Sequence, residues 1–378
     1  MIVAAVLSVA CHKDKHPDSE DVPYPMSERV VVVYIMGENS LSGYVKRDLN
    51  EMRLGASKIP DNCRLVIYYD DSESNEKPKI LSLSRQGGEE VLHQYDTDPV
   101  STDSATMQNV LAYITTKCPA QHYGLVLWSH GSGWTPPRAR TIGIDNGSNT
   151  LSNLGTEMEI STLAHVMENT GRHWDYVFFD ACFMQGVEVA YQLRKVTDWC
   201  IGSPAEIPGR GAPYDQIMSD LFATTDDCWR IAETYHNAYE MENGVVLSTV
   251  RTSELEALAA ATAPHIREME TYPTSGIQTY CAYSATTIWK PEYFDIGSAM
   301  ALWLDNNDYA AWLEVFRRAV PHYYLPHSWL TAYSSVIVPI ISDSEHAVGL
   351  SFYIPIEGRN QLNQAFPKTD WYRAINGK

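Results

Sequence analysis

One histidine and one cysteine stand out because each ends a short apolar run. His130 follows Tyr-Gly-Leu-Val-Leu-Trp-Ser and precedes Gly131, and Cys182 follows Asp-Tyr-Val-Phe-Phe-Asp-Ala. The histidine comes 52 residues before the cysteine. An imidazole beside a thiol can remove its proton, so that the sulfur attacks a carbonyl carbon. The two residues therefore predict a cysteine nucleophile with a histidine base.

The backbone around this pair is expected to assist the reaction. A helix is predicted from Cys182 to about Arg194, and its free N–H groups and positive dipole end would favour the thiolate. The N–H of Gly131 and that of Cys182 could together form an oxyanion hole. His130 would then protonate the leaving amine and activate water.

Each residue has a simpler interpretation when it is taken alone. A single cysteine is usually a small buried hydrophobic residue, and a histidine on an apolar strand is usually a core residue. The combination and its order favour chemistry. Papain-like enzymes carry the cysteine first, whereas a histidine about 50 residues before an Ala-Cys pair is the caspase arrangement.

The elements that must position the pair are short strands alternating with helices. Apolar runs bounded by turn residues are typical of strands buried on both faces. Strands are predicted at Val30–Met36, Cys63–Tyr69, Leu125–Ser129, Tyr176–Phe179 and Trp199–Ser203, with helices at 41–54, 103–117 and 161–171, the last capped by Ser161. Residues 80–84 and 90–95 suggest a hairpin around Gly87-Gly88. The carboxyl ends of parallel strands meet at one edge, where open α/β sheets place their sites.

The pattern becomes looser after residue 225. Helices are predicted at 229–242, 254–270, 294–304 and 309–319, and strands at 244–250, 336–341 and 348–355. We expect residues 29–225 to form the catalytic core, residues 226–355 to form the C-terminal part of the same domain, and residues 356–378 to be a surface tail.

Composition restricts the partners. The chain has 378 residues, of which 44% are hydrophobic, and a net charge of −19. This acidic balance argues against nucleic acid or an anionic membrane surface as a partner. No Cys-x-x-Cys pair occurs, so zinc-knuckle and thioredoxin-type sites are unsupported. The number of cysteines is odd, which leaves at least one thiol unpaired in any disulfide scheme. The seven cysteines are Cys11, Cys63, Cys118, Cys182, Cys200, Cys228 and Cys281.

The N-terminus resembles an export signal. Residues 2–10 form an apolar run too short to span a membrane and similar to the central part of a signal peptide. The end Ser-Val-Ala-Cys resembles a bacterial lipobox, which would make Cys11 the lipidated first residue. Residues 1–11 are then a signal peptide, and residues 12–28 a flexible tether. We expect an exported protein at the bacterial cell envelope or surface, held to the membrane only through its lipid.

Several motifs resemble the clostripain family of caspase-like cysteine peptidases. They are Tyr-Ile-Met-Gly-Glu-Asn-Ser-Leu (34–41), Leu-Val-Leu-Trp-Ser-His-Gly-Ser-Gly-Trp (125–134) and Phe-Asp-Ala-Cys-Phe-Met-Gln-Gly-Val-Glu-Val-Ala-Tyr-Gln-Leu (179–193). The resemblance implies a caspase-like α/β fold, a mostly parallel sheet flanked by helices with a C-terminal extension. It also implies an endopeptidase with His130 and Cys182 as the catalytic dyad and peptides or proteins as substrates.

The resemblance also implies how substrates are selected. The family typically prefers Arg or Lys before the cleaved bond, held by acidic residues. Asp180 matches one of them, although it equally resembles an aspartate that binds backbone N–H groups at a strand end. The loop from Ser203 to Tyr214 adds Glu206 and also Arg210, whose cation could repel a basic side chain or pair with Asp180. We therefore expect weaker basic specificity than the family usually has.

Two further properties follow from the resemblance. Family members are often activated by self-cleavage between the histidine and the cysteine, where Arg138 and Arg140 are candidate sites or simply part of a solvated basic loop. No cofactor is required, but calcium is associated with some members. Asp145-Asn146-Gly147 could contribute oxygens to it, although this cluster first suggests a turn. The alternative function is a catalytically silent surface lipoprotein that binds peptides or proteins.

Overall fold

The protein is described by a computed structural model that covers most of the chain. The described residues are 22–72, 77–85, 88–134, 142–146, 155–239, 244–280, 293–330, 337–339 and 346–377. All statements below concern these residues.

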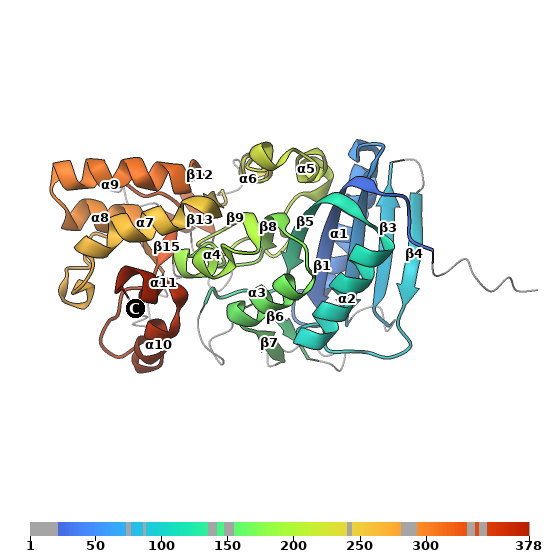
Figure 1. The fold of residues 1–378 in the computed structure, drawn as a ribbon, viewed down its shortest axis with the longest axis horizontal. Coiled ribbons are helices and arrows are strands. Elements are labelled where there is room, and N and C mark those ends of the chain that lie inside the picture. The colour runs from blue at the N-terminus through green and yellow to red at the C-terminus, as the bar shows by residue number, and fades with distance from the viewer. Residues whose placement is uncertain are drawn as a thin grey trace, which may run out of the picture.

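A nine-stranded sheet forms the centre of the molecule (Figure 1). Its strand order is β12-β10-β9-β8-β5-β1-β2-β3-β4. The strands are β1 (Ser27–Gly37), β2 (Cys63–Asp71), β3 (Lys79–Ser84), β4 (Gly88–Gln94), β5 (Ala120–Trp128), β8 (Trp174–Asp180), β9 (Thr197–Gly202), β10 (Leu247–Arg251) and β12 (His322–Tyr324). The five central strands, β9, β8, β5, β1 and β2 in spatial order, pair in parallel. The strands at both edges of the sheet pair antiparallel to their neighbours. This confirms the predicted mostly parallel sheet, and the pairing of β3 with β4 confirms the hairpin.

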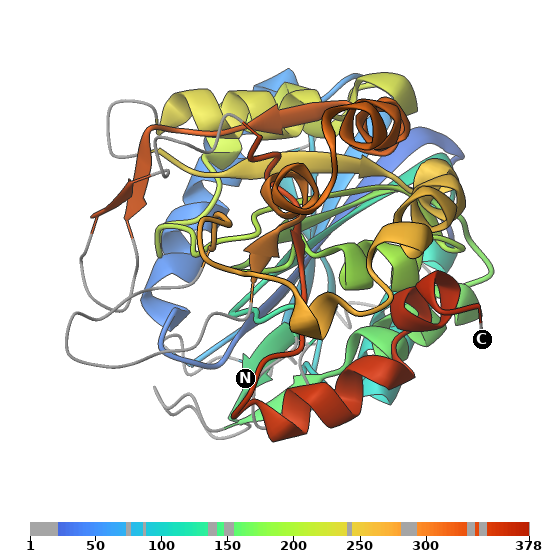
Figure 2. The same cartoon turned by 90° about the vertical axis from the view of Figure 1, so that its left-hand side faces the viewer.

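Helices cover both faces of the sheet, because alternate residues of a strand point to opposite sides. In β1, Val31 and Val33 pack in one apolar cluster with helices α1 (Ser42–Gly55), α5 (Tyr214–Leu221) and α6 (Arg230–Ala238). Val30 and Val32 pack in another with α2 (Ser104–Lys117), α3 (Ile160–Asn169) and α4 (Val187–Leu193). Figure 2 shows the strands between these two layers. The residue before α3 is Glu159, so Ser161 is not its cap.

The chain after residue 225 continues the same sheet. Strand β10 pairs with β9, and β12 pairs with β10. Helices α7 (Leu255–Thr262), α8 (Ile296–Trp303) and α9 (Asn306–Ala319) lie at this end of the molecule (Figure 1). Three small two-stranded pairs complete the strands: β6 (Ile142–Asp145) with β7 (Thr156–Met158), β11 (Phe294–Asp295) with β15 (Ser351–Phe352), and β13 (Ser328–Leu330) with β14 (Ile337–Pro339).

The last residues of the chain are part of the core. Helices α10 (Asn360–Ala365) and α11 (Asp370–Ile375) bury few side chains each, Leu362 in the first and Trp371 and Ile375 in the second. Phe366 and Trp371 are fully buried in the same apolar cluster as α2, α3 and α4. Residues 356–377 therefore do not form the surface tail expected from the sequence, because their apolar side chains are buried rather than exposed.

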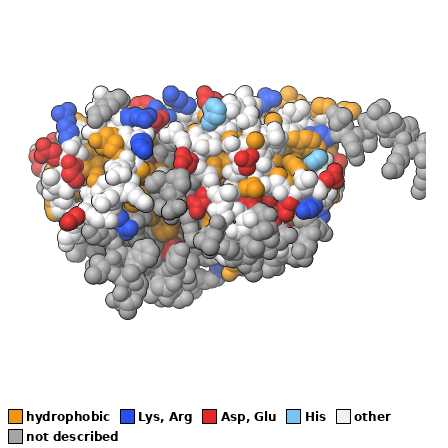
Figure 3. Space-filling view, turned by 90° about the horizontal axis from the view of Figure 1, so that it is seen from below, with side chains coloured by type: hydrophobic (Ala, Val, Ile, Leu, Met, Phe, Trp, Pro, Cys, Tyr) orange, Lys and Arg blue, Asp and Glu red, His pale blue; other side chains and the backbone are white. Residues whose placement is uncertain are grey.

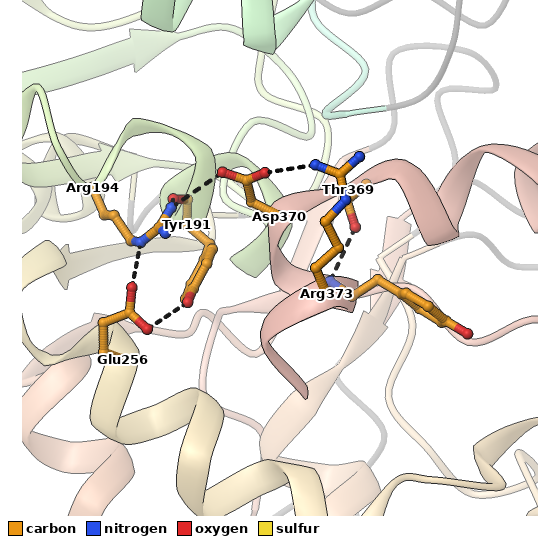
Figure 4. Close-up of polar contacts among 7 residues, drawn as sticks. Tyr191, Arg194, Glu256, Thr369, Asp370 and Arg373 are labelled. Atoms are coloured by element: carbon orange, nitrogen blue, oxygen red, sulfur yellow. Dashed lines mark hydrogen bonds and ion pairs between the residues drawn. The ribbon is translucent and has the colours of Figure 1, made fainter. Parts of the chain in front are cut away.

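Polar contacts hold α11 against its neighbours (Figure 4). The guanidinium of Arg194 donates to Glu256 of α7 at 2.7 Å and to Asp370 of α11 at 3.4 Å. The hydroxyl of Tyr191 donates to the other oxygen of Glu256 at 2.6 Å. One arginine thus joins α4, α7 and α11, which are distant in the sequence.

The fold begins earlier than Arg29. The N–H of Tyr24 donates to the carbonyl of Lys117 at 2.8 Å, and the guanidinium of Arg64 lies 4.0 Å from the centroid of the Tyr24 ring. The predicted tether therefore overlaps the folded part by several residues. Cys11 lies outside the described residues. Among the helices that the structure describes, none is long and apolar enough to cross a membrane.

Acidic and basic side chains are mixed on the face of the molecule that Figure 3 shows. The chain has 47 acidic and 28 basic residues. On this face the excess negative charge is spread among basic residues rather than gathered in one patch.

Candidate active site

The parallel pairing of β5 and β8 places the histidine and the cysteine side by side. The register pairs Trp128 with Asp180, and His130 and Cys182 each lie two residues further along. A Cβ atom at Gly131 would lie 2.6 Å from the carbonyl oxygen of Cys182. Because real Cβ atoms do not approach so closely, only glycine allows this contact. The structure therefore brings the His130–Gly131 segment directly against Cys182, at the carboxyl edge of the sheet.

His130 is held by the loop that follows β1. The Oγ of Ser40 lies 2.9 Å from Nε2 of His130. The loop is held in turn by buried Asn39, whose amide donates to the carbonyls of Met36 and Ile144 at 2.9 and 2.8 Å. Ser40 lies within the motif at 34–41, but nothing in that motif indicates a role for its hydroxyl. A hydroxyl that reaches a histidine 90 positions away leaves no local signal in the sequence.

The predicted helix opening at Cys182 is wrong. Helix α4 begins only at Val187, and the residue after the cysteine, Phe183, has a φ of 61°. The N–H of Phe183 donates to the carbonyl of Ala205 and that of Gln185 to the carbonyl of Ser203, both at 3.0 Å. These N–H groups therefore bind a neighbouring loop, and no helix start lies at the sulfur.

Burial keeps the Cys182 thiol protonated. It raises the pKa of the thiol to about 12, with Glu206 and Asp180 adding to the rise, while the N–H of Ile207, 3.4 Å from Sγ, works against it. Both burial and nearby negative charge disfavour a thiolate. The isolated thiol is therefore neutral at pH 7, contrary to the expectation of a helix-stabilised thiolate.

The turn after the cysteine is stabilised by an aromatic pair. A φ of 61° is costly for a residue such as Phe183, and such strain is common at functional sites. The Phe183 ring stacks on Tyr293 with centroids 4.6 Å apart. The hydroxyl of Tyr293 donates to the carbonyl of Ser132 at 2.8 Å, close to His130 in the chain. The pair thus connects the segments after the histidine and after the cysteine.

Residues 203–213 form the loop that borders the cysteine, and Asp180 anchors it. The Asp180 carboxylate accepts from the N–H of Ala212 at 3.0 and 3.1 Å and from the hydroxyl of Tyr214 at 2.9 Å. Burial raises the pKa of this carboxyl to about 6, although these hydrogen bonds lower it. This geometry matches the backbone-binding interpretation of Asp180.

Glu206 and Arg210 come from the same loop but lie in different surroundings. Glu206 is buried, with only 3% of its surface exposed, and its charge acts on Cys182. The guanidinium of Arg210 lies 4.4 Å from the centroid of the Tyr239 ring, and the Tyr239 hydroxyl donates to the carbonyl of Gly211 at 2.7 Å.

The other predicted residues are placed as follows. Gly131 lies opposite Ile142, and the N–H of Gly143 donates to the carbonyl of His130 at 2.9 Å. Gly131 and Ile142 therefore form a non-hydrogen-bonded antiparallel pair, in which the N–H of Gly131 does not donate to β6. Arg138 and Arg140 lie outside the described residues.

The Asp145-Asn146-Gly147 cluster has structural roles in its described part. Asp145 ends β6, and its carboxylate accepts from the N–H and the hydroxyl of Ser101. The amide of Asn146 donates to the carbonyl of Glu38 at 2.7 Å. Gly147 lies outside the described residues.

Comparison with known proteins agrees with this geometry. The model of the Clostripain family matches residues 33–318. Clostripain from Hathewaya histolytica is 25% identical over 233 residues, which are 52% of this chain and 43% of that protein. The match thus spans less than half the length of this curated relative.

Two solved structures are similar over nearly their whole length. One is a secreted cysteine protease from Bacteroides thetaiotaomicron in complex with an irreversible peptide inhibitor, with 32% identity, a TM-score of 0.80, and coverage of 93% of this chain and 99% of that one. The other is an inactive zymogen protease from Parabacteroides distasonis, with 29% identity, a TM-score of 0.80, and coverage of 94% and 99%. The chain therefore belongs to the clostripain family of cysteine peptidases.

Proposed function

We propose that the protein is an exported bacterial cysteine endopeptidase in which His130 and Cys182 form the catalytic dyad. The observation that carries the proposal is the contact between the His130–Gly131 segment and Cys182 at the carboxyl ends of β5 and β8. The family membership supports peptides or proteins as substrates.

In this mechanism the thiol loses its proton as it attacks. Because Nε2 of His130 is engaged by Ser40, we assign proton transfer to Nδ1. As Sγ bonds to the substrate carbonyl carbon, the proton moves to His130 and then to the leaving amine as the C–N bond breaks. Water, deprotonated by His130, hydrolyses the thioester. The N–H groups of Gly131 and Cys182 would stabilise the oxyanion.

Alanine variants of the dyad test the proposal. Cys182→Ala and His130→Ala should each abolish peptide hydrolysis, since nucleophile and base act as one unit. Cys63→Ala removes a buried thiol of β2 and serves as the matched control, which should keep turnover. Near-normal hydrolysis by the Cys182→Ala protein would contradict the mechanism.

For specificity, we propose that Asp180, Glu206 and Arg210 border the first specificity pocket. A carboxylate that binds a basic substrate side chain contributes about 1.5–3 kcal/mol per charge-assisted hydrogen bond. Asp180 already accepts bonds from Ala212 and Tyr214, which supports Glu206 as the main acid. The Arg210 cation offsets part of this attraction, so discrimination for Arg or Lys is weak.

The test is the ratio of kcat/KM for Arg-ending and neutral fluorogenic peptides. Arg210→Ala and Arg210→Asp should both raise this ratio, the second by more. Arg53→Ala, which removes a surface arginine paired with Glu89, is the control. An unchanged ratio in both Arg210 variants would place Arg210 outside the pocket.

For location, we propose lipidation at Cys11 after removal of residues 1–10. The apolar run before Cys11 supports this, as does the description of a similar protease as secreted. A bacterial lipoprotein carries more than one acyl chain, enough for stable anchoring. Cys11→Ser should therefore move the protein out of the membrane fraction; if the variant fractionates like the parent, the anchor is not at Cys11.

We also propose activation by self-cleavage at Arg138 or Arg140. A similar protease is known as an inactive zymogen, which supports a processing step. The purified parent should produce a new N-terminus just after one of these arginines, and the Cys182→Ala protein should stay intact. Cleavage of the Cys182→Ala protein under the same conditions would contradict a self-catalysed step.

A further inference from the structure

The side chain of Tyr293 contacts both segments that carry the proposed oxyanion donors. Tyr293 immediately precedes β11 and is 8% exposed. Its hydroxyl donates to the carbonyl of Ser132, the residue after Gly131, at 2.8 Å. Its ring stacks on that of Phe183, the residue after Cys182, with centroids 4.6 Å apart and planes 11° from parallel. A single side chain from the C-terminal half of the chain therefore joins the two strand ends that form the site.

The segment after His130 is held from a second direction by β6. The N–H of Gly143 donates to the carbonyl of His130 at 2.9 Å. This carbonyl and the N–H of Gly131 belong to one planar trans peptide, so holding the first aims the second in the opposite direction. The peptide before Gly131 is thus held by β6, and the peptide after Ser132 is held by Tyr293.

Two glycines allow this segment to lie directly against the turn after the cysteine. A Cβ at Gly131 would lie 2.6 Å from the carbonyl oxygen of Cys182. A Cβ at Gly133, which has a φ of 71°, would lie 3.1 Å from the carbonyl oxygen of Phe183 and 3.4 Å from Cε1 of Tyr293. The Tyr293 ring therefore packs beside the second of these contacts. Because such packing leaves little space, a displaced ring would shift both segments.

The position of Tyr293 is fixed by the C-terminal half of the chain. Its carbonyl accepts from the N–H of Tyr280 at 2.9 Å. Strand β11, which follows Tyr293, pairs with β15, and the N–H of Ser351 in β15 donates to the carbonyl of Gln185 at 3.0 Å. The framework that carries Tyr293 thus returns to the turn after the cysteine.

We propose that Tyr293 is a positioning residue for the oxyanion hole, whose two donor segments it holds at the spacing that the tetrahedral intermediate requires. The inference rests on the proposed dyad and on the N–H groups of Gly131 and Cys182 as donors. Donors stabilise an oxyanion best when they are fixed at about 2.7–3.1 Å from its position before the reaction begins. A displacement of about 1 Å costs roughly a hundredfold in rate. Tyr293 therefore acts on kcat rather than on substrate binding.

Two substitutions separate the hydroxyl from the ring. Tyr293→Phe keeps the stack on Phe183 but removes the donor to Ser132, and should lower kcat by about two- to tenfold. Tyr293→Leu also removes the stack and should lower kcat by about a hundredfold. KM for the same peptide should change little in either variant. Tyr113→Phe is the matched control, because the Tyr113 hydroxyl also donates to a backbone carbonyl at 2.8 Å, that of Leu92, between α2 and β4.

Two probes distinguish a role in the oxyanion hole from a purely structural role. A peptide aldehyde forms a hemithioacetal with Cys182: Sγ bonds to the carbonyl carbon, the π electrons move to the oxygen, and the thiol proton passes to His130. With iodoacetamide the same sulfur displaces iodide, so no oxyanion forms. The Tyr293 variants should therefore weaken aldehyde inhibition by the same factor as kcat/KM, while the iodoacetamide rate at Cys182 stays at the parent value.

The outcomes assign a failure to this inference or to the proposed function. Parent-like kcat and aldehyde inhibition in Tyr293→Leu, with a parent that hydrolyses peptides through Cys182, would overturn the role of Tyr293 alone. An equal loss of iodoacetamide reactivity would also overturn it, because the damage would then lie at the thiol. If Tyr293→Leu does not fold, Tyr293→Phe decides by the same comparison. A parent without Cys182-dependent hydrolysis would refute the proposed function, and this inference with it.

Discussion

At the scale of single residues, the orientation of His130 depends on a hydroxyl that sequence patterns do not reveal. The Oγ of Ser40 lies 2.9 Å from Nε2. A hydrogen bond of this kind contributes about 0.5–1.5 kcal/mol, which corresponds to roughly two- to tenfold in rate. Ser40→Ala should therefore lower kcat by that factor with little change in KM.

The control for this variant is Ser219→Ala, on the exposed side of α5. Both variants should unfold at midpoints close to that of the parent, since neither side chain fills the core. If Ser40→Ala has the same kcat as Ser219→Ala, the hydroxyl does not position the histidine.

The protonated thiol of Cys182 predicts a distinctive pH dependence. Its pKa is raised to about 12, chiefly by burial, so the thiolate fraction at pH 7 is very small and grows about tenfold per pH unit up to that value. Alkylation by iodoacetamide should follow the same slope between pH 7 and pH 10. The rate is measured as the difference between the parent and Cys182→Ala, which corrects for other thiols. A plateau of fast alkylation from pH 6 upward would instead indicate a thiolate–imidazolium pair.

At the scale of elements, the sequence predicts the strands well and the turns poorly. The runs ending at His130 and Cys182 are apolar throughout because their strands are buried on both faces. The sequence predicts a helical turn after Cys182, because Val187 and Tyr191 continue the helical spacing backwards to the cysteine, and this prediction is wrong. What decides the conformation is the pair of hydrogen bonds from Phe183 and Gln185 to residues about 20 positions away, which no local pattern encodes.

The 203–213 loop depends on a glycine against Asp180. Gly211 has a φ of 61°, and a Cβ there would lie 2.7 Å from Oδ2 of Asp180. Gly171 has a φ of 64°, but a Cβ there would meet nothing within 4 Å. Both alanine variants incur the backbone cost, about 1–2 kcal/mol, whereas only Gly211→Ala also displaces the carboxylate.

Urea unfolding and peptide hydrolysis separate these two effects. Gly211→Ala should lose more free energy of unfolding than Gly171→Ala, and only Gly211→Ala should lower kcat/KM. Equal losses of stability, with equal activity, would show that the contact between Gly211 and Asp180 does not shape the loop.

At the scale of the whole molecule, the sequence predicts the central sheet but not the packing of the C-terminal segment against it. Alternating strands and helices indicate the parallel centre, and the pairing of β5 with β8 places the segments that carry His130 and Cys182 at the same edge of the sheet. The burial of the C-terminal segment is not evident from the sequence, because Trp371 and Phe366 stand among polar residues and a short helix shows little periodicity. The ring of Trp371 packs against Tyr191 of α4, and that of Phe366 packs against Trp134. These partners lie far away in the sequence, so no local pattern encodes the contacts.

Trp371 tests the role of this segment in stability. The side chain is fully buried, so Trp371→Ala should lower the free energy of unfolding by about 3–5 kcal/mol. Leu302→Ala, at a side chain that is 46% exposed, should change it by less than about 0.5 kcal/mol. Equal unfolding midpoints in urea for the two variants would mean that α11 contributes nothing to the stability of the domain.

The central claim is that Cys182 is a nucleophile activated by His130. The direct measurement is labelling of the purified full-length protein with a peptidyl acyloxymethyl ketone, followed by intact mass and peptide mapping. The account predicts one adduct per chain, located on Cys182, with labelling abolished in Cys182→Ala and strongly slowed in His130→Ala. A parent protein that binds the peptide but forms no adduct at Cys182 would contradict it, and would indicate a protein that keeps the peptidase fold only to bind.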